Sequence, residues 1–320
     1  MARATQQGIS PHGRGPVHLC YNGAGNSRAL RGIGREGQAK RLIAAFCFVF
    51  GLVIGSFLNV CIRRLPQGRS IVRPGSHCRA CGAVIRAWDN IPLLSYLLLR
   101  GRCRKCGARI SPLYPAVELA AGILFLLGYW SYGLSWLLVK NLLFFSLMLV
   151  LIFTDLLERA LPDRITLGGA LAGIAVSFLA PPGDGTARWL SDRLFAFPPP
   201  AAAIHLADAL LGAGISAGAL WLVGAVYARL RGRQGLGFGD VKMMLLIGAF
   251  LGTKLTLLTI LVGSLLGSIV GILFIWLARK DQHYELPFGT FLGLAAMLVT
   301  FYGTAILNWY QTLLRPGGTG

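Results

Sequence analysis

Residues 136–155 read WLLVKNLLFFSLMLVLIFTD, an almost continuous apolar run that ends on a single acid, Asp155. A helix needs about 20 apolar residues to cross a bilayer, so this stretch predicts a membrane-spanning helix with an ionisable group at one end. Comparable apolar blocks recur at 42–62, 115–132, 165–181, 204–228, 255–277 and 288–308, and a shorter one at 241–252. The pattern predicts an all-α integral membrane protein with about eight transmembrane helices.

The composition agrees with a membrane protein. Of the 320 residues, 55% are hydrophobic and only 13% are charged, whereas soluble domains carry roughly a quarter charged residues. The formal net charge of +19 would suit a nucleic-acid-binding protein, but many of the basic residues lie in loops beside apolar blocks. We therefore expect the lipid bilayer to be the partner of this chain, and we expect no nucleic-acid partner.

The loop between the first two apolar blocks holds eleven basic residues, from Arg63 to Arg109, and one acid, Asp89. Basic loops beside spans stay on the cytoplasmic side, which predicts a cytoplasmic loop and, with eight spans, both termini outside. The first 41 residues carry seven basic residues and favour the opposite orientation, but we expect the longer loop to dominate. The predicted parts are a disordered basic tail (1–41), a first transmembrane helix (42–62), a loop domain (63–112), a helical membrane domain (113–310) and a C-terminal tail (311–320).

Two cysteine pairs in this loop have a spacing close to that of a four-cysteine zinc site. They are Cys78-x2-Cys81 and Cys103-x2-Cys106, with 21 residues between them and a glycine after each. Four thiolates close a tetrahedral shell, so a structural zinc that staples a small loop is expected. The alternatives are two disulfides, which a reducing cytoplasm disfavours, four free thiols, and a site in which His77 replaces one cysteine.

Two acids lie where apolar blocks meet the predicted cytoplasmic face. Asp155 ends one block, and Asp240 precedes the short block at 241–252. Ionisable groups at membrane depth are costly and suggest function. At the same depth the two carboxylates could share a proton, one acting as base toward water and the other as acid toward a carbonyl. Glu118, which begins its block, is equally well explained by the helix dipole, and Asp208 lies near the outer end of its block.

Asp240 closes the segment Gly237-Phe238-Gly239-Asp240. The two glycines remove side chains from one backbone edge, so an extended substrate could approach there. The block that follows has 12 residues, about 18 Å as a helix, against a hydrocarbon core of about 30 Å. Asp240 is therefore expected in a water-accessible recess below the membrane surface. Lys242 either tunes the carboxylate pair or only extends to the membrane surface.

Further segments complete a pattern in which the order along the chain is specific. In addition to the cysteine pairs and the two acids, they are Gly55-Ser56-Phe57-Leu58-Asn59-Val60, Arg64-Leu65-Pro66, Asn90-Ile91-Pro92-Leu93-Leu94-Ser95-Tyr96, Gly101-Arg102-Cys103, Tyr114-Pro115 with Glu118, and Leu161-Pro162-Asp163. From about residue 42 to 308 the chain resembles the type IV prepilin peptidases, which are bifunctional leader peptidases and N-methyltransferases. One departure is Thr290, since the family usually has Pro-Phe-Gly-Pro where this chain has Pro287-Phe288-Gly289-Thr290.

The resemblance implies an aspartic endopeptidase, with residues 113–310 as its peptidase domain. Its catalytic residues would be Asp155 and Asp240, supported by Gly237, Gly239, Lys242, Pro287, Phe288 and Gly289. It would cut type IV prepilins or pseudopilins after a glycine, between a short basic leader and a hydrophobic helix. It would then methylate the new N-terminus with S-adenosylmethionine. The site would face the cytoplasm from a bacterial cytoplasmic (inner) membrane.

No residues are assigned to the methyl donor. Gly263, Gly267 and Gly271, four apart in one apolar block, indicate a helix-packing stripe rather than a phosphate-binding loop. Two other functions also fit the acids or the loop: a proton-coupled transporter that uses the intramembrane aspartates, and a non-catalytic protein of pilus or secretion assembly. The transporter leaves the cysteine loop unexplained, and a cleavage assay separates all three.

Overall fold

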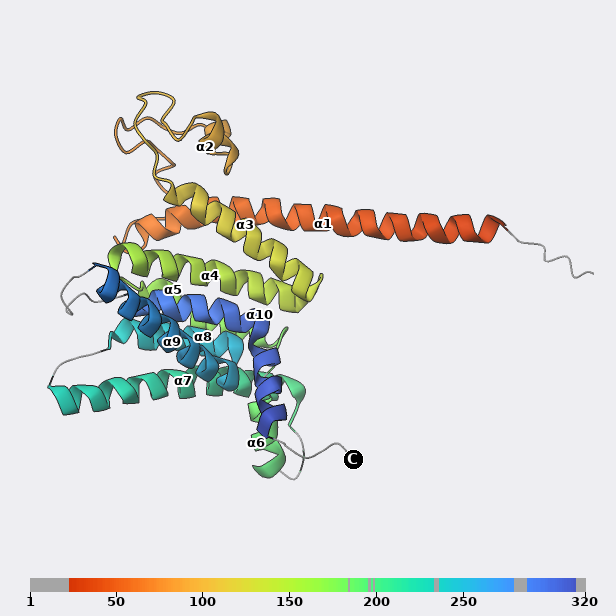
Figure 1. Cartoon of the computed structure of the whole chain (residues 1–320), viewed down its shortest axis with the longest axis vertical. Coiled ribbons are helices and arrows are strands. Elements are labelled where there is room, and N and C mark those ends of the chain that lie inside the picture. The colour runs from red at the N-terminus through yellow and green to blue at the C-terminus, as the bar shows by residue number, and fades with distance from the viewer. Residues whose placement is uncertain are drawn as a thin grey trace, which may run out of the picture. The chain divides into compact units, whose positions relative to one another are not determined.

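The computed structural model describes residues 23–183, 185–194, 197, 199–232, 236–278 and 287–314, with the backbone alone at 23–36, 275 and 278. The described residues form helices and loops, with two isolated β-bridges and no strand (Figure 1). The chain divides into two compact units, Met1–Ile43 and Ala44–Gly320. The tail predicted to be disordered at 1–41 lies partly outside the described residues. From Gly23 onward it belongs to α1 (Gly23–Arg64), which contains no proline to interrupt it.

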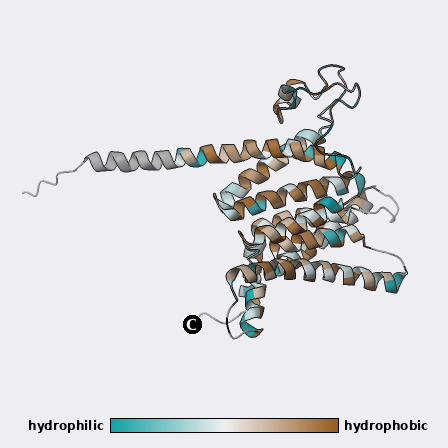
Figure 2. Ribbon diagram, turned by 180° about the vertical axis from the view of Figure 1, so that it is seen from behind, coloured by the Kyte–Doolittle hydropathy of each residue, from teal (hydrophilic) through white to brown (hydrophobic). Residues whose placement is uncertain are grey.

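Six helices among the described residues are long and apolar enough to cross a membrane. They are the Gly37–Arg64 part of α1, α3 (Leu113–Tyr132), α4 (Trp136–Glu158), α7 (Ala201–Arg231), α9 (Thr253–Ala278) and α10 (Phe288–Leu314). Apolar residues run along these helices in Figure 2. The helical membrane fold, with a small loop domain between the first two spans, is confirmed.

The predicted count of eight spans is not confirmed. The two remaining apolar blocks form α5 (Asp163–Ser177) and α8 (Phe238–Leu251), which have 15 and 14 residues. Both fall short of the roughly 20 residues that a spanning helix needs. The apolar block predicted at 165–181 forms a helix only as far as Ser177. Pro181 and Pro182, which follow, cannot continue a helix.

The end of α4 positions the first candidate aspartate. This helix begins after Ser135, whose hydroxyl accepts the N–H of Leu138, and it ends at Glu158 before Arg159 in the left-handed conformation. Pro162 then separates α4 from α5, because proline is tolerated at a helix start but breaks a helix interior. Asp155 therefore lies in the last turn of α4, beside a chain reversal.

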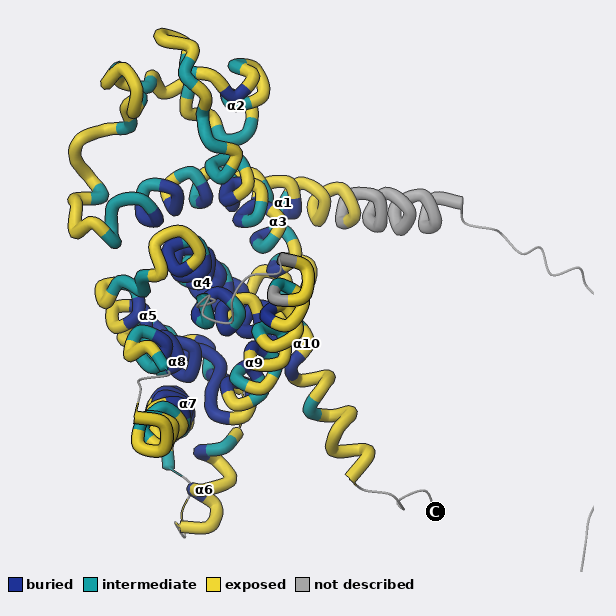
Figure 3. The backbone as a smooth tube through the Cα atoms, turned by 60° about the vertical axis from the view of Figure 1, so that its left-hand side comes forward, coloured by how far each residue is buried: buried dark blue, intermediate teal, exposed yellow. Residues whose placement is uncertain are grey.

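Helix α8 lies among the other helices of the membrane domain, packed against α5, α7, α9 and α10. Figure 3 shows it in dark blue, the colour of buried residues, together with much of α4. From Met243 to Leu251 its side chains are apolar on every side, as expected for a helix segment enclosed by protein. The contact with α7 is close because Gly248 faces Gly212, and a β-carbon on either would overlap the backbone of the other helix.

Helix α10 packs against α4, α8 and α9. The small residues predicted as a packing stripe on α9 lie in this contact: a β-carbon at Gly263 would be 3.0 Å from Leu292, and one at Gly267 would be 3.5 Å from Phe291. The helix-packing interpretation is confirmed for these two glycines. The N-terminal turn of α10 thereby meets the end of α4 and the start of α8.

Candidate active site and metal centre

Asp155 and Asp240 converge on Gly289, in the first turn of α10. A β-carbon added to Gly289 would lie 3.0 Å from Asp155 Oδ2 and 3.2 Å from Asp240 Oδ1. These two oxygens are therefore at most about 6 Å apart, the sum of the two separations, a range in which carboxylates influence each other's protonation. The two side chains are buried, with 6% and 9% of their residue surface exposed. The structure thus brings together the two aspartates that the sequence singled out.

Asp155 is held by Thr290. The backbone N–H of Thr290 donates to Asp155 Oδ2 at 2.6 Å, and its hydroxyl donates to the same oxygen at 2.9 Å. First-turn N–H groups lack partners within their own helix, and the positive end of the helix dipole favours a carboxylate. Asp155, in the last turn of α4, therefore also caps the start of α10. Sequence reasoning noted Thr290 only as a departure from a proline and gave it no place in the site.

Asp240 is the third residue of α8 and is held by the start of its own helix. Its carboxylate accepts the N–H of Gly237, and its own N–H donates to the Gly237 carbonyl at 3.1 Å. An acid at this helix position commonly reaches back to the residue before the helix in this way. The segment from Gly237 to Asp240 is thus a helix start that carries its own acidic cap.

The two glycines beside Asp240 pack closely against the protein itself. A β-carbon at Gly237 would lie 3.3 Å from Asp240 Oδ2, and one at Gly239 would lie 3.2 Å from Leu161. Both separations are tighter than ordinary van der Waals contact. Larger residues would therefore displace either the carboxylate or the turn between α4 and α5, a role that sequence reasoning did not assign to these glycines.

The remaining residues predicted to support the site lie around it. Lys242 Nζ donates to Asp163 Oδ1 at 2.7 Å and lies 5.1 Å from the centre of the Phe238 ring. Lys242 therefore links α8 to the start of α5. Phe288 packs against the buried core, and Pro287 directly precedes α10.

The four loop cysteines form a separate cluster whose Sγ atoms all lie within 4.8 Å of one another: Cys78, Cys81, Cys103 and Cys106. All four are free thiols, and the Sγ atoms of Cys78 and Cys106 are 3.7 Å apart. A disulfide would need about 2 Å, whereas tetrahedral Zn–S bonds of about 2.3 Å place sulfurs about 3.8 Å apart. N–H groups of Cys81 and Ala80 donate to the Cys78 sulfur and lower its pKa to about 6. The cluster could hold a metal ion.

Each half of the cluster repeats one local fold. The N–H of Cys78 donates to the Ala83 carbonyl and that of Gly82 to the Cys78 carbonyl, and the same two bonds recur at Cys103. Gly82 and Gly107 have φ of 66° and 70°, in the left-handed region that glycine adopts without strain. The glycine after each cysteine pair is thus required by the turn that aims the sulfurs inward.

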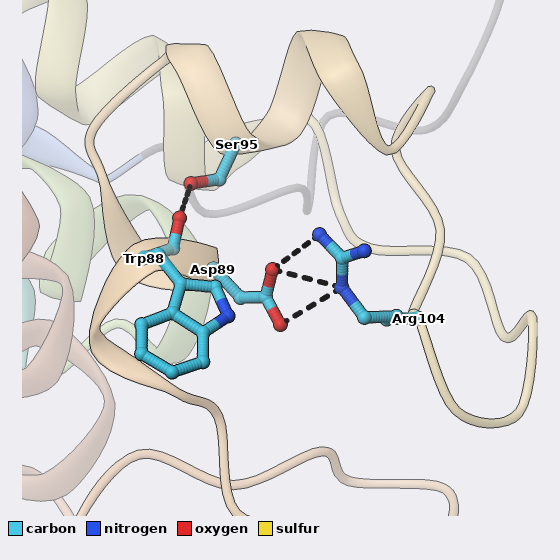
Figure 4. A network of polar contacts seen from close by, with 4 residues as sticks. All are labelled: Trp88, Asp89, Ser95 and Arg104. Carbon is cyan, nitrogen blue, oxygen red and sulfur yellow. Dashed lines mark hydrogen bonds and ion pairs between the residues drawn. The ribbon is translucent and has the colours of Figure 1, made fainter.

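Figure 4 shows the polar contacts that order the loop beside this cluster. Arg104 donates to both oxygens of Asp89, at 2.7 to 3.1 Å, and this pairing raises the pKa of its guanidinium. The Ser95 hydroxyl donates to the Trp88 carbonyl at 3.0 Å. The Arg104–Asp89 contact joins the second cysteine pair to the segment between the pairs, and the Ser95–Trp88 bond orders that segment itself.

The other two buried acids bind backbone. Glu118 accepts the N–H of Leu93 at 2.9 Å, which ties the loop domain to the first turns of α3. Asp208 on α7 accepts the N–H of Ala187 at 2.6 Å, near the start of α6 (Thr186–Leu194). His77 is not one of the four clustered ligands, and its Nδ1 lies 3.0 Å from the Gly75 carbonyl. Glu118, Asp208 and His77 thus each contact the backbone of another segment or of their own loop, which is a structural role.

Two family models match adjacent parts of the chain: the bacterial peptidase A24 N-terminal domain at residues 49–132, and the type IV leader peptidase family at residues 142–272. Among curated proteins, a prepilin leader peptidase/N-methyltransferase of Pseudomonas putida is 33% identical over 83% of this chain and 93% of its own length. A prepilin leader peptidase/N-methyltransferase of Myxococcus xanthus is 40% identical over 86% of this chain and 77% of its own length. No solved structure matches the chain. The resemblance found in the motifs is thereby confirmed, and the chain belongs to the type IV leader peptidase family.

Proposed function

We propose that this chain is an integral-membrane aspartic endopeptidase that removes the leader peptide of type IV prepilins or pseudopilins by cutting after a glycine. The observation that carries the proposal is the convergence of Asp155 and Asp240 on Gly289. Membership of the leader peptidase family and the names of the relatives support the substrate class.

The chemistry follows from two buried carboxylates that share one proton. Both cannot ionise at this separation without strong repulsion, so one stays protonated. The ionised carboxylate takes a proton from a water molecule, whose oxygen adds to the carbonyl carbon, while the protonated one donates to the carbonyl oxygen. Transfer of a proton to the amide nitrogen then breaks the C–N bond, and the carboxyl pair regains its single proton.

The crowding at Gly289 supports cleavage after a glycine. Since an added β-carbon at Gly289 would touch both carboxylates, little room exists beside this turn of α10. A substrate residue without a side chain can bring its backbone closest to such a pair. Substrates with a larger residue at the cut are therefore expected to react more slowly.

We infer that the four-cysteine cluster holds a structural zinc ion. The separations of the sulfur atoms suit tetrahedral zinc, and four thiolates leave no coordination position for water. Zinc would staple a loop that has little buried apolar surface of its own.

The names of the relatives support a second activity, N-methylation of the new N-terminus with S-adenosylmethionine as the methyl donor. The carboxylate pair would provide the acceptor by freeing the amine. The eleven basic residues between Arg63 and Arg109 support a cytoplasmic loop domain and a site facing the cytoplasm from a bacterial cytoplasmic membrane.

The test is cleavage by the purified protein in liposomes. A synthetic prepilin with its leader should be cut after the leader glycine, as read by mass spectrometry. Asp155→Asn and Asp240→Asn should each reduce cleavage to background, while Glu158→Gln, an exposed acid in the same turn of α4, should leave it unchanged. Full cleavage by either asparagine variant would remove that residue from the mechanism. An intact wild-type protein without cleavage would favour the transporter or the assembly protein.

A further inference from the structure

The two carboxylates of the candidate dyad have unequal hydrogen-bond environments. Asp155 Oδ2 accepts two bonds from Thr290, one from the N–H at 2.6 Å and one from the hydroxyl at 2.9 Å. The Thr290 hydroxyl has one proton, and its other acceptor, the Ile152 carbonyl, is farther away at 3.4 Å. The Thr290 hydroxyl therefore donates its hydrogen bond to the Asp155 carboxylate rather than to the Ile152 carbonyl.

Two donors on one oxygen stabilise a negative charge there, because hydrogen bonds to the ionised form of a carboxylate favour that form. Among the residues that the structure describes, the donor to the Asp240 carboxylate is the N–H of Gly237. The shared proton is therefore expected to reside on Asp240, and the charge on Asp155.

We propose that Thr290 is a positioning residue that divides the roles of the dyad, with Asp155 as the base and Asp240 as the acid. This inference rests on the proposed peptidase function. With Oδ2 occupied by Thr290, the other oxygen of Asp155 takes the proton from water, and the resulting hydroxide adds to the carbonyl carbon. Asp240 donates its proton to the carbonyl oxygen. In the second step Asp155 returns its proton to the leaving nitrogen, and Asp240 recovers one from the intermediate.

The neighbouring charges are the same in every variant proposed below. The charged residues at this end of the adjoining helices are, in chain order, Arg63, Arg64, Glu118, Glu158, Arg159, Asp163, Arg164, Arg229, Arg231 and Lys242. Lys242 and Asp163 form an ion pair with each other at 2.7 Å. Helix α10 itself contains no charged residue, and Lys254 on α9 lies at the start of that helix, after the end of α8. A change at Thr290 therefore alters the donors to Asp155 without adding or removing a charge.

Three substitutions separate the two donors. Thr290→Val removes the hydroxyl and keeps the N–H and the side-chain shape, Thr290→Ser keeps both donors, and Thr290→Pro removes both. Thr300→Val is the matched control, because Thr300 lies on the same helix and its hydroxyl donates to the Ala296 carbonyl at 2.7 Å. Each protein is purified and assayed for prepilin cleavage across the pH range.

Removing a donor makes the ionised form of Asp155 less favoured, so the carboxylate keeps its proton to higher pH. The acid limb of the kcat/KM profile should therefore move up by about one pH unit in Thr290→Val, and at least as far in Thr290→Pro. Thr290→Ser and Thr300→Val should keep the wild-type limb.

A loss of rate in Thr290→Val that is equal at every pH would show a structural role alone and would overturn the proposal. A shift confined to the basic limb would place the effect on the other carboxyl group and would also overturn it. Failure of the peptidase proposal is a separate result, seen as absent cleavage in the wild type or as full cleavage by Asp155→Asn.

Discussion

Gly289 lies so close to Asp155 that a β-carbon at this glycine would be 3.0 Å from Asp155 Oδ2. The same β-carbon would lie 3.2 Å from Asp240 Oδ1, and both separations are tighter than ordinary van der Waals contact. Three helices meet at this point, since Asp155 lies in the last turn of α4, Asp240 in the first turn of α8 and Gly289 in the first turn of α10. The relationship makes Gly289 the most direct structural probe of the site.

Gly289→Ala is expected to reduce kcat/KM for prepilin cleavage by about 100-fold, because displacing reacting groups by about 1 Å can cost this much. The added methyl group must push one or both carboxylates from their places. Gly218→Ala on α7 is the matched control, since a β-carbon there would meet no atom within 4 Å. Equal activity in both variants would show that the site tolerates the shift, and thermal unfolding of both proteins checks their fold.

The two aspartates should behave as one unit. Asp155→Asn and Asp240→Asn should each abolish cleavage, and the double variant should be no slower than either single variant, because a dyad that has lost one member has no further activity to lose. Single-turnover rates with a prepilin peptide measure this. If the double variant were slower by the product of the two single effects, the residues would act independently.

One zinc ion per chain should accompany protein purified without chelator, as measured by elemental analysis. Cys106→Ser should lose most of it, because a tetrahedral site with three thiolates binds more weakly. Cys47→Ser is the matched control, since Cys47 is buried in α1 away from the four clustered sulfurs. Stoichiometric zinc in Cys106→Ser, or none in the wild type, would contradict the assignment. Loss of zinc should affect methyl transfer at least as much as cleavage.

The two activities should be separable. The carboxylate pair is built on α4 and α8, whereas the cysteine loop connects α1 and α3. Asp155→Asn should therefore still methylate a pilin peptide that already has a free N-terminal amine, with S-adenosylmethionine as donor. A cysteine-loop variant that remains folded should still cleave prepilin. A folded Asp155→Asn protein that cannot methylate the supplied amine would mean that one site serves both reactions.

Much of the fold could be predicted because it depends on local properties. Six apolar blocks have the length that the bilayer core demands, and each forms a long helix in the structure. The apolar block that forms α8 was predicted as a span because apolar composition does not distinguish burial in lipid from burial in protein. The buried surroundings of α8 and the end of α5 before two prolines became clear only with the structure.

The sequence by itself determined the membrane helices, the cysteine spacing and the two aspartates at the ends of apolar blocks, because each depends on residues close together in the chain. Only the tertiary structure decided that both carboxylates lie beside Gly289 and that Thr290 holds Asp155. The Thr290 bonds join residues 135 positions apart. Such contacts depend on how α4, α8 and α10 pack against one another, and that packing arises from side chains and glycines on all three helices at once.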